Sequence, residues 1–142
     1  MGRGISSASR IIAALAQTTI AEAVTGVVGS TFSVRGARYL LIEAIFNYGS
    51  GGTNAKFWVQ TRVNGGTWRD IANFAFTTSA ATKWSAVHKD TALAAAIAAS
   101  DAALADDTIL NGMLGDEIRI KYTTTGTYAG ATNIKITVNA LD

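Results

Sequence analysis

The sequence has 142 residues, enough for one domain with a single hydrophobic core, and its charged residues make up only 15% against about 25% in an average soluble domain. It contains no cysteine, no run of basic residues and no long apolar run, which excludes disulfides and thiolate metal sites and argues against nucleic acid and a membrane as partners. The charge deficit suggests instead that other subunits cover part of the surface.

Residues 1–30 are expected to form an N-terminal arm or extension, with a short helix as the alternative. Its leader carries Arg3 and Arg10 among glycines and serines, and Ile11 and Ile12 follow. The apolar stretch is shorter than the core of a signal peptide, which argues against secretion. A leader of this composition is either disordered or becomes ordered where it lies across a neighbouring subunit.

Residues 31–142 are predicted to form a single β-sandwich domain. Proline is absent, while 14 glycines supply turns between segments rich in threonine, valine and isoleucine, the residues that favour strands. Thr31 to Val34 and Arg38 to Tyr48 look like strands. Residues 39–46 are almost continuously apolar, which predicts a central strand covered on both faces.

Residues 57–74 are predicted to form two strands that turn at Asn64-Gly65-Gly66. Bulky and charged residues occur on both faces of this hairpin. One face should meet the core, and the other is expected to contact a neighbouring subunit. The candidate contact residues on that face are Trp58, Gln60, Arg62, Arg69 and Asn73.

The segment after this hairpin changes character abruptly. Lys83 to His88 is compatible with a strand, whereas residues 91–105 contain nine alanines. Alanine is the best helix former, so this alanine-rich insertion is expected to be a short helix or an ordered excursion between strands.

The C-terminal third shows the clearest alternation. Asp116 to Tyr122 alternates apolar and charged residues, and Ile134, Ile136 and Val138 repeat the apolar pattern. The glycines within 123–132 would permit a tight reversal, so we predict a C-terminal hairpin. Five to eight strands joined by glycine-rich turns favour an all-β, jelly-roll-like sandwich.

No catalytic or metal-binding constellation is evident. His88 has Ser85 and Asp90 near it in sequence, but these positions cannot converge as a triad on a strand. The acidic pairs at 106–107 and 116–117 match a calcium loop only loosely and are interpreted as solvated turns. We expect no cofactor. The three tryptophans, Trp58, Trp68 and Trp84, belong either to a core or interface or to a carbohydrate platform, and the first interpretation is favoured.

Three segments resemble small virion proteins encoded by tailed bacteriophages: Y-G-S-G-G-T at 48–53, W-V-Q-T-R-V-N-G-G-T-W-R-D-I-A-N-F-A-F-T-T at 58–78, and L-G-D-E-I-R-I-K-Y-T-T-T-G-T-Y-A-G-A-T at 114–132. These motifs specify strands and turns rather than a reaction. Val63 and Asn64 replace the acidic turn residue that is commoner in the relatives. The alanine-rich segment and the leader lie outside the resemblance.

The resemblance implies a non-enzymatic virion protein, either a capsid decoration (cement) protein or a minor head protein that binds the major capsid protein. We expect it on the capsid exterior, as a homo-oligomer or symmetric array, made in the host bacterial cytoplasm. A tail or head–tail junction protein and a carbohydrate-binding adsorption module are the alternatives. The residues expected at subunit interfaces are Arg3, Arg10, Ile11, Ile12, Trp58, Gln60, Arg62, Arg69 and Asn73.

Overall fold

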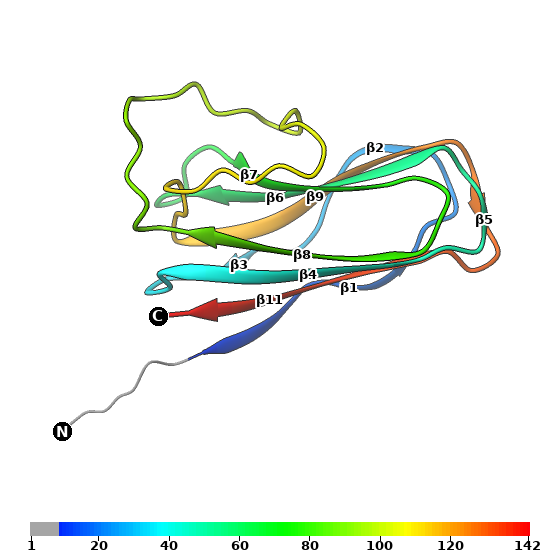
Figure 1. Cartoon of the computed structure of the whole chain (residues 1–142), viewed down its shortest axis with the longest axis horizontal. Helices are drawn as coiled ribbons and strands as arrows, with labels where there is room; N and C mark the ends of the chain where they lie inside the picture. The colour runs from blue at the N-terminus through cyan, green and yellow to red at the C-terminus, as the bar shows by residue number, and fades with distance from the viewer. Residues whose placement is uncertain (1–8) are drawn as a thin grey trace.

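Antiparallel strands supply all of the regular secondary structure in residues 9–142, the part of the chain that the computed structural model describes (Figure 1). One sheet has the order β1-β11-β4-β8, formed by Arg10–Thr19, Asn133–Leu141, Tyr39–Asn47 and Ala81–His88. The facing sheet has the order β2-β9-β6-β7, formed by Val24–Val28, Glu117–Thr125, Asn54–Arg62 and Arg69–Phe76, and β3 (Phe32–Ser33) also pairs with β9. The predicted β-sandwich is therefore confirmed, while its jelly-roll character stays a prediction.

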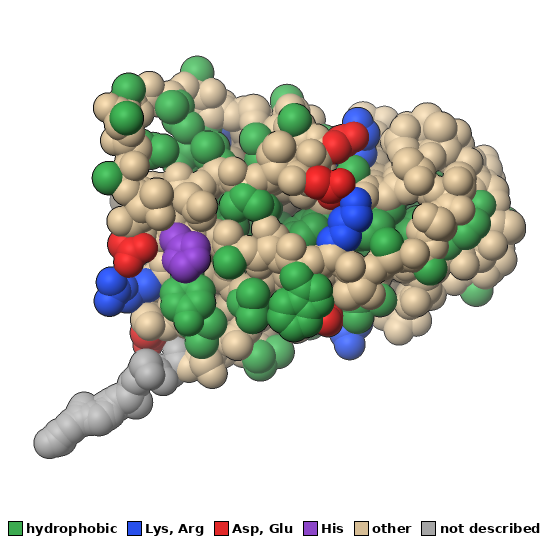
Figure 2. Space-filling model, viewed as in Figure 1, with side chains coloured by type: hydrophobic (Ala, Val, Ile, Leu, Met, Phe, Trp, Pro, Cys, Tyr) green, Lys and Arg blue, Asp and Glu red, His purple; other side chains and the backbone are tan. Residues whose placement is uncertain are grey.

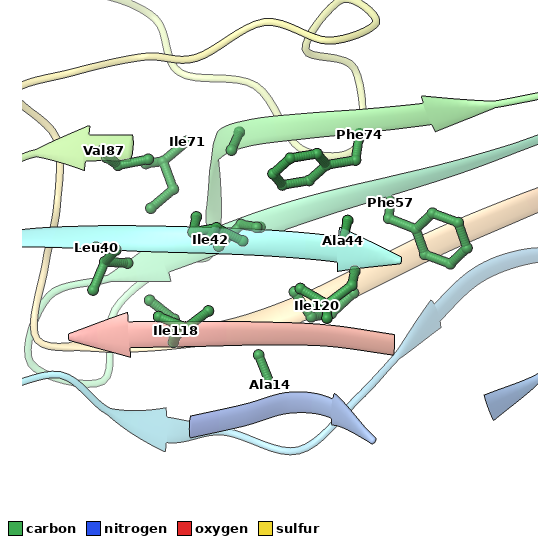
Figure 3. Packing of buried hydrophobic residues seen from close by; sticks show 14 of the residues in the cluster. Ala14, Leu40, Ile42, Ala44, Phe57, Ile71, Phe74, Val87, Ile118 and Ile120 are labelled. Carbon is green, nitrogen blue, oxygen red and sulfur yellow. The ribbon is translucent and has the colours of Figure 1, made fainter. Parts of the chain in front are cut away.

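The core lies between these two sheets and follows from the period-two pattern of the strands. Leu40, Ile42, Ala44 and Phe46 of β4 are all buried, and so are the alternating residues of β11 and β9. Figure 3 shows Leu40 and Ile42 from one sheet pointing into the same space as Ile118 and Ile120 from the other.

The hairpin of β6 and β7 turns where the sequence predicts. Asn64 and Gly65 both have positive φ, 51° and 71°, and the Gly66 N–H donates to the Val63 carbonyl at 2.9 Å. Two positive φ angles at the centre of a two-residue turn match the right-handed twist of a hairpin. Further along, a bulge between Val59 and Gln60 interrupts the β6–β7 pairing.

The N-terminal region differs from the expectation of an arm. Residues 10–19 form strand β1, which pairs with β11 from Arg10↔Ala140 to Thr19↔Asn133, and Val24–Val28 pairs with β9. Ala14 is buried in the core, and Ile12 packs against it. Because β11 offers a free edge that β1 completes, residues 10–28 belong to the sandwich and the short-helix alternative does not hold for them. Arg3 lies outside the described residues.

The predicted C-terminal hairpin is wrong. β9 pairs with β6 and β2 in one sheet, whereas β11 pairs with β4 and β1 in the other. The connection between them crosses the end of the sandwich, where β10 (Tyr128–Ala129) pairs with β5 (Ser50–Gly51). Tyr128 is buried there, contacts Phe46 edge-on at 5.7 Å and donates from its hydroxyl to the Thr77 carbonyl. Burial of this side chain therefore favours a crossing over a tight reversal.

Candidate docking surface

The alanine-rich insertion is neither a helix nor a strand, and part of it covers the outer face of β6 and β7. Residues 89–116 form an irregular excursion that arches over these strands in Figure 1. We call residues 100–112 the strap. The ordered excursion that the sequence predicts is thus observed, and the helix is not.

Asp70 of β7 holds the strap. Its side chain is fully buried, and its carboxylate accepts hydrogen bonds from the backbone N–H groups of Ala102, Ala103 and Leu104 at 2.8–3.0 Å. It also accepts hydrogen bonds from Gln60 Nε2 and from Ser100 Oγ, both at 2.9 Å. These charge-assisted hydrogen bonds hold residues 102–104 in a non-helical conformation, with Ala102 at a φ of 54°, despite the high helix propensity of alanine.

The electrostatics of Asp70 follow from this arrangement. Burial alone would raise the pKa of its carboxyl group, but the hydrogen bonds from Gln60 and from the three backbone N–H groups outweigh that effect, so the pKa lies below its ordinary value. Asp70 is therefore ionised wherever other aspartates are, and its charge belongs to the folded structure.

The strap also covers the edge of β7. Asn73 N–H donates to the Thr108 carbonyl and Leu110 N–H donates to the Ile71 carbonyl, both at 2.9 Å, with an antiparallel bridge between Ala72 and Ile109. An exposed strand edge invites pairing with another chain. The strap occupies that position along these residues.

Three predicted contact residues lie beneath the strap. Trp58 is 6% exposed and donates from its indole N–H to the Leu104 carbonyl at 3.0 Å; Gln60 and Asn73 are also buried, and Asn73 Oδ1 accepts from the Asp107 N–H. The second face of the hairpin is therefore covered by the chain itself. In this conformation these three side chains are not available to a neighbouring subunit, which corrects the expectation from sequence.

Arg62 and Arg69 lie beside the strap in a half-buried cluster around Trp68. The guanidinium carbons of Arg62 and Arg119 lie 4.5 and 4.6 Å from the centre of the Trp68 ring, a cation–π arrangement. Arg62 also pairs with Glu117 at 2.7 Å, and burial lowers the pKa of Arg119. Trp68 is thereby occupied by its own chain.

The outer face of the β1-β11-β4-β8 sheet is different, because large hydrophobic side chains lie exposed on it. Ile11 is 71% exposed and Trp84 is 62% exposed, while Tyr39, Leu41 and Ile45 of β4 are half-buried. Figure 2 shows hydrophobic side chains gathered in a band over β8 and β4. We call this surface the open face; its residues are Ile11, Tyr39, Leu41, Glu43, Ile45, Trp84, His88, Lys135, Thr137 and Asn139.

The open face shares one feature with interaction surfaces, an exposed tryptophan beside exposed and half-buried aliphatic side chains. Monomers rarely expose contiguous apolar patches, and interface cores are enriched in tryptophan and tyrosine and poor in charge. It also corrects the prediction that β4 is covered on both faces: its inward residues are buried, but its outward residues have no second layer among residues 9–142. Of the predicted N-terminal contacts, Ile11 lies on this face, Ile12 packs against the core, and Arg10 donates to the Arg35 carbonyl.

Sequence reasoning missed Leu41, Glu43 and Trp84 as members of one surface. The register aligns Trp84 with Glu43 and Glu43 with Thr137 across three adjacent strands. The available signal was a glutamate in the middle of an apolar strand, since a charge at such a position implies that one face is not core. Strand pairing between segments about 40 and 90 residues apart was needed to assemble the rest.

The polar groups considered for catalysis or metal binding are separated. His88 stacks on Tyr39 with ring centres 5.1 Å apart. Asp107 pairs with Lys83, Asp106 with Lys56 and Glu117 with Arg62. Within residues 9–142, no group of three or more histidine, cysteine or acidic side chains lies close enough to hold a metal ion.

No helix of the described chain is long and apolar enough to cross a membrane. Comparison of the sequence with protein-family models, and of the chain with curated proteins and with solved structures, finds no match.

Proposed function

We propose that this chain is a non-enzymatic structural protein of a tailed-phage virion, a capsid decoration or minor head protein that docks on the major capsid protein through its open face. The observation that carries the proposal is the exposure of Ile11 and Trp84 on a sheet face whose central β4 residues Tyr39, Leu41 and Ile45 are half-buried. The resemblance of the hairpin and C-terminal motifs to small phage virion proteins supplies the biological setting.

The mechanism is burial of apolar area at many equivalent sites. Each copy contributes about 25 cal/mol per Å² of apolar surface removed from water, before the costs of association are subtracted. A symmetric shell repeats the same contact over its surface. Each bound copy then adds the same contact, so the reinforcement of the shell increases with the number of copies bound.

The test is association with the particle. Mass spectrometry of purified virions should detect the protein, and shells that lack it should rebind the purified wild-type protein. Ile11→Glu and Trp84→Glu should reduce rebinding strongly, because a buried unpaired carboxylate is costly. Val63→Glu is the matched control, since Val63 is 69% exposed at the tip of the β6–β7 hairpin, away from the open face. Virions without the protein would end the proposal.

Copy number separates the two structural alternatives. Hundreds of copies per particle support a shell protein, whereas about 3 to 12 copies would place the protein at the head–tail junction or in the tail, following the symmetry of those assemblies.

A carbohydrate-binding role depends on Trp84. Trp58 is buried and Trp68 lies between two guanidinium groups, so Trp84 is the one tryptophan with an exposed ring. Its neighbours include the aliphatic Ile11 and Leu41 and the polar Glu43, Thr137 and Asn139. The aliphatic side chains are the feature that favours a protein partner over a sugar. Binding of host-surface glycans that is lost in Trp84→Ala would reverse this preference.

A further inference from the structure

The open face contains a shallow pocket of about 200 Å³ whose walls combine four kinds of side chain. Trp84 supplies an aromatic ring, Ile11 and Leu41 supply aliphatic walls, and Glu43 supplies a carboxylate. Thr137 and Asn139 complete the lining. The pocket therefore brings a negative charge and an aromatic face together in an apolar setting.

Glu43 forms no ion pair with the described chain, although Lys135 lies on the same face, diagonal to it on β11. Among residues 9–142 no lysine, arginine or histidine lies within ion-pair distance of its carboxylate, whereas Asp90, Asp101, Asp106, Asp107, Asp116 and Glu117 each have one. Its side chain is half-buried between Trp84 and Thr137. A half-buried carboxylate that has no ion-pair partner and lies beside an aromatic ring offers a contact for a cation.

A second polar group in the pocket also lacks a partner. The Asn139 Oδ1 atom is shielded from solvent and accepts no hydrogen bond from the described residues. Rotation of this amide can turn either of its polar ends toward the pocket. With its oxygen toward the pocket, Asn139 would add a second acceptor beside the carboxylate of Glu43.

We propose that this pocket is a binding site for an arginine side chain of a partner polypeptide. A guanidinium group has five donors and no acceptor, and its planar face stacks on aromatic rings. Its methylene stem packs on aliphatic side chains while the charged end reaches a carboxylate. In this pocket Trp84 supplies the aromatic face for the guanidinium group. Leu41 and Ile11 supply the aliphatic surface for the stem, and Glu43 supplies the carboxylate.

Lysine and sugars fit the same lining less well. An ammonium group is compact and strongly hydrated, so it gains less from stacking on Trp84. A sugar would place several hydroxyl groups against the aliphatic walls. The proposal deepens the proposed function, on which it rests for the identity of the partner: the arginine would belong to the capsid protein that meets the open face.

The direct test uses the full-length protein and N-acetyl-arginine amide as the probe, followed by NMR and by Trp84 fluorescence. We expect saturable shifts at Leu41, Glu43, Trp84 and Asn139, with weaker binding of N-acetyl-lysine amide and none of N-acetyl-leucine amide. Glu43→Gln should weaken binding about tenfold, as expected for loss of a charge-assisted contact. Trp84→Leu should also weaken it, whereas Glu22→Gln, an exposed acid-to-amide control outside the face, should leave it unchanged.

Three results would overturn the proposal: equal affinity for the leucine and arginine probes, shifts spread over acidic residues outside the pocket, or unchanged binding in a folded Glu43→Gln protein. Glycan binding at Trp84 in place of arginine binding would also overturn it. The two proposals fail separately. If the protein binds the arginine probe but is absent from virions, only the proposed function is contradicted. If the protein is present in virions but binds the probe equally well without the Glu43 carboxylate, only the arginine site is contradicted.

Discussion

At the scale of single residues, Asp70 is the most consequential side chain. Five donors converge on its buried carboxylate, and three of them are consecutive backbone N–H groups of the strap. Replacing Asp70 with asparagine keeps one acceptor oxygen but turns an NH2 group toward the two or three donors on the other side, which are left unsatisfied. That penalty is larger than the loss of one ordinary hydrogen bond, because charged groups form the stronger contacts.

We predict that Asp70→Asn lowers the free energy of unfolding by about 2–4 kcal/mol, measured by urea denaturation. The matched control is Asp90→Asn, which breaks an exposed ion pair with Arg38. That change should cost less than about 0.5 kcal/mol. Equal effects of the two substitutions would show that the Asp70 contacts do not hold the strap.

The lowered pKa of Asp70 also predicts how the stability of the protein depends on pH in acid. Its folded pKa lies below the ordinary value of 3.8, so its contribution is fully present above that value and is lost as the pH falls through the lower, folded pKa. Wild-type stability should therefore decline below about pH 4. Asp70→Asn should show a smaller decline over this range, and an unchanged acid profile would contradict the assignment.

A second residue-scale prediction concerns Gly52. Its φ is +72°, and a methyl group at this position would overlap the ring of the buried Tyr128. Gly52→Ala should therefore combine backbone strain with a steric conflict and cost about 2–4 kcal/mol in thermal or urea unfolding. Gly36→Ala is the control, since φ is +86° there but nothing lies within 4 Å. It should cost only the strain, about 1–2 kcal/mol.

At the scale of elements, the irregular excursion of residues 89–116 is held along the strap and makes no backbone N–H hydrogen bonds with the described residues in 92–99, ahead of the strap. The N–H groups of 102–104, Asp107, Leu110 and Gly112 donate hydrogen bonds, whereas those of 92–99 donate none within the described chain. We predict that amide exchange is about ten- to a hundredfold slower in 102–112 than in 92–99. Hydrogen-exchange mass spectrometry measures this difference. Uniformly fast exchange across 92–112 would contradict the hydrogen bonds that hold the strap against β7.

Elements with a clear two-residue period could be predicted from the sequence, and those fixed by distant contacts could not. β4, β8, β9, β11 and the β6–β7 hairpin were all readable, because alternation and turn residues are local signals. The C-terminal connection was misread because its glycines permit both a reversal and a crossing. Only the burial of Tyr128 against Phe46 decides between them.

The same division applies to the candidate sites. The sequence predicts an ordered excursion as one alternative, but not its position over β6 and β7, since its alanines favour a helix locally and Asp70 acts from 30 or more positions away. The open face was indicated indirectly by the low charge of the chain. Its members could not be listed without the register that sets Trp84 beside Glu43.

At the scale of the whole molecule, the two outer faces of the sandwich differ in whether the chain itself covers them. The face of β6 and β7 is covered by the strap, which buries Trp58 and caps the edge of β7. The face of β4 and β8 keeps Trp84 exposed. One side of the sandwich is therefore covered by its own chain, whereas the other side keeps large hydrophobic side chains exposed.

This asymmetry predicts opposite effects of the same substitution on the two faces. Trp84→Glu should change the free energy of unfolding by less than about 0.5 kcal/mol, because the exposed indole contributes little to the isolated fold. Trp58→Glu should cost more than about 3 kcal/mol, since it buries a carboxylate under the strap and removes the hydrogen bond to Leu104. Urea denaturation of both variants, with Ile11→Glu as a second probe of the open face, makes the comparison. A large loss of unfolding free energy in Trp84→Glu would mean that Trp84 stabilises the isolated fold. The exposure of this side chain would then no longer support a docking surface.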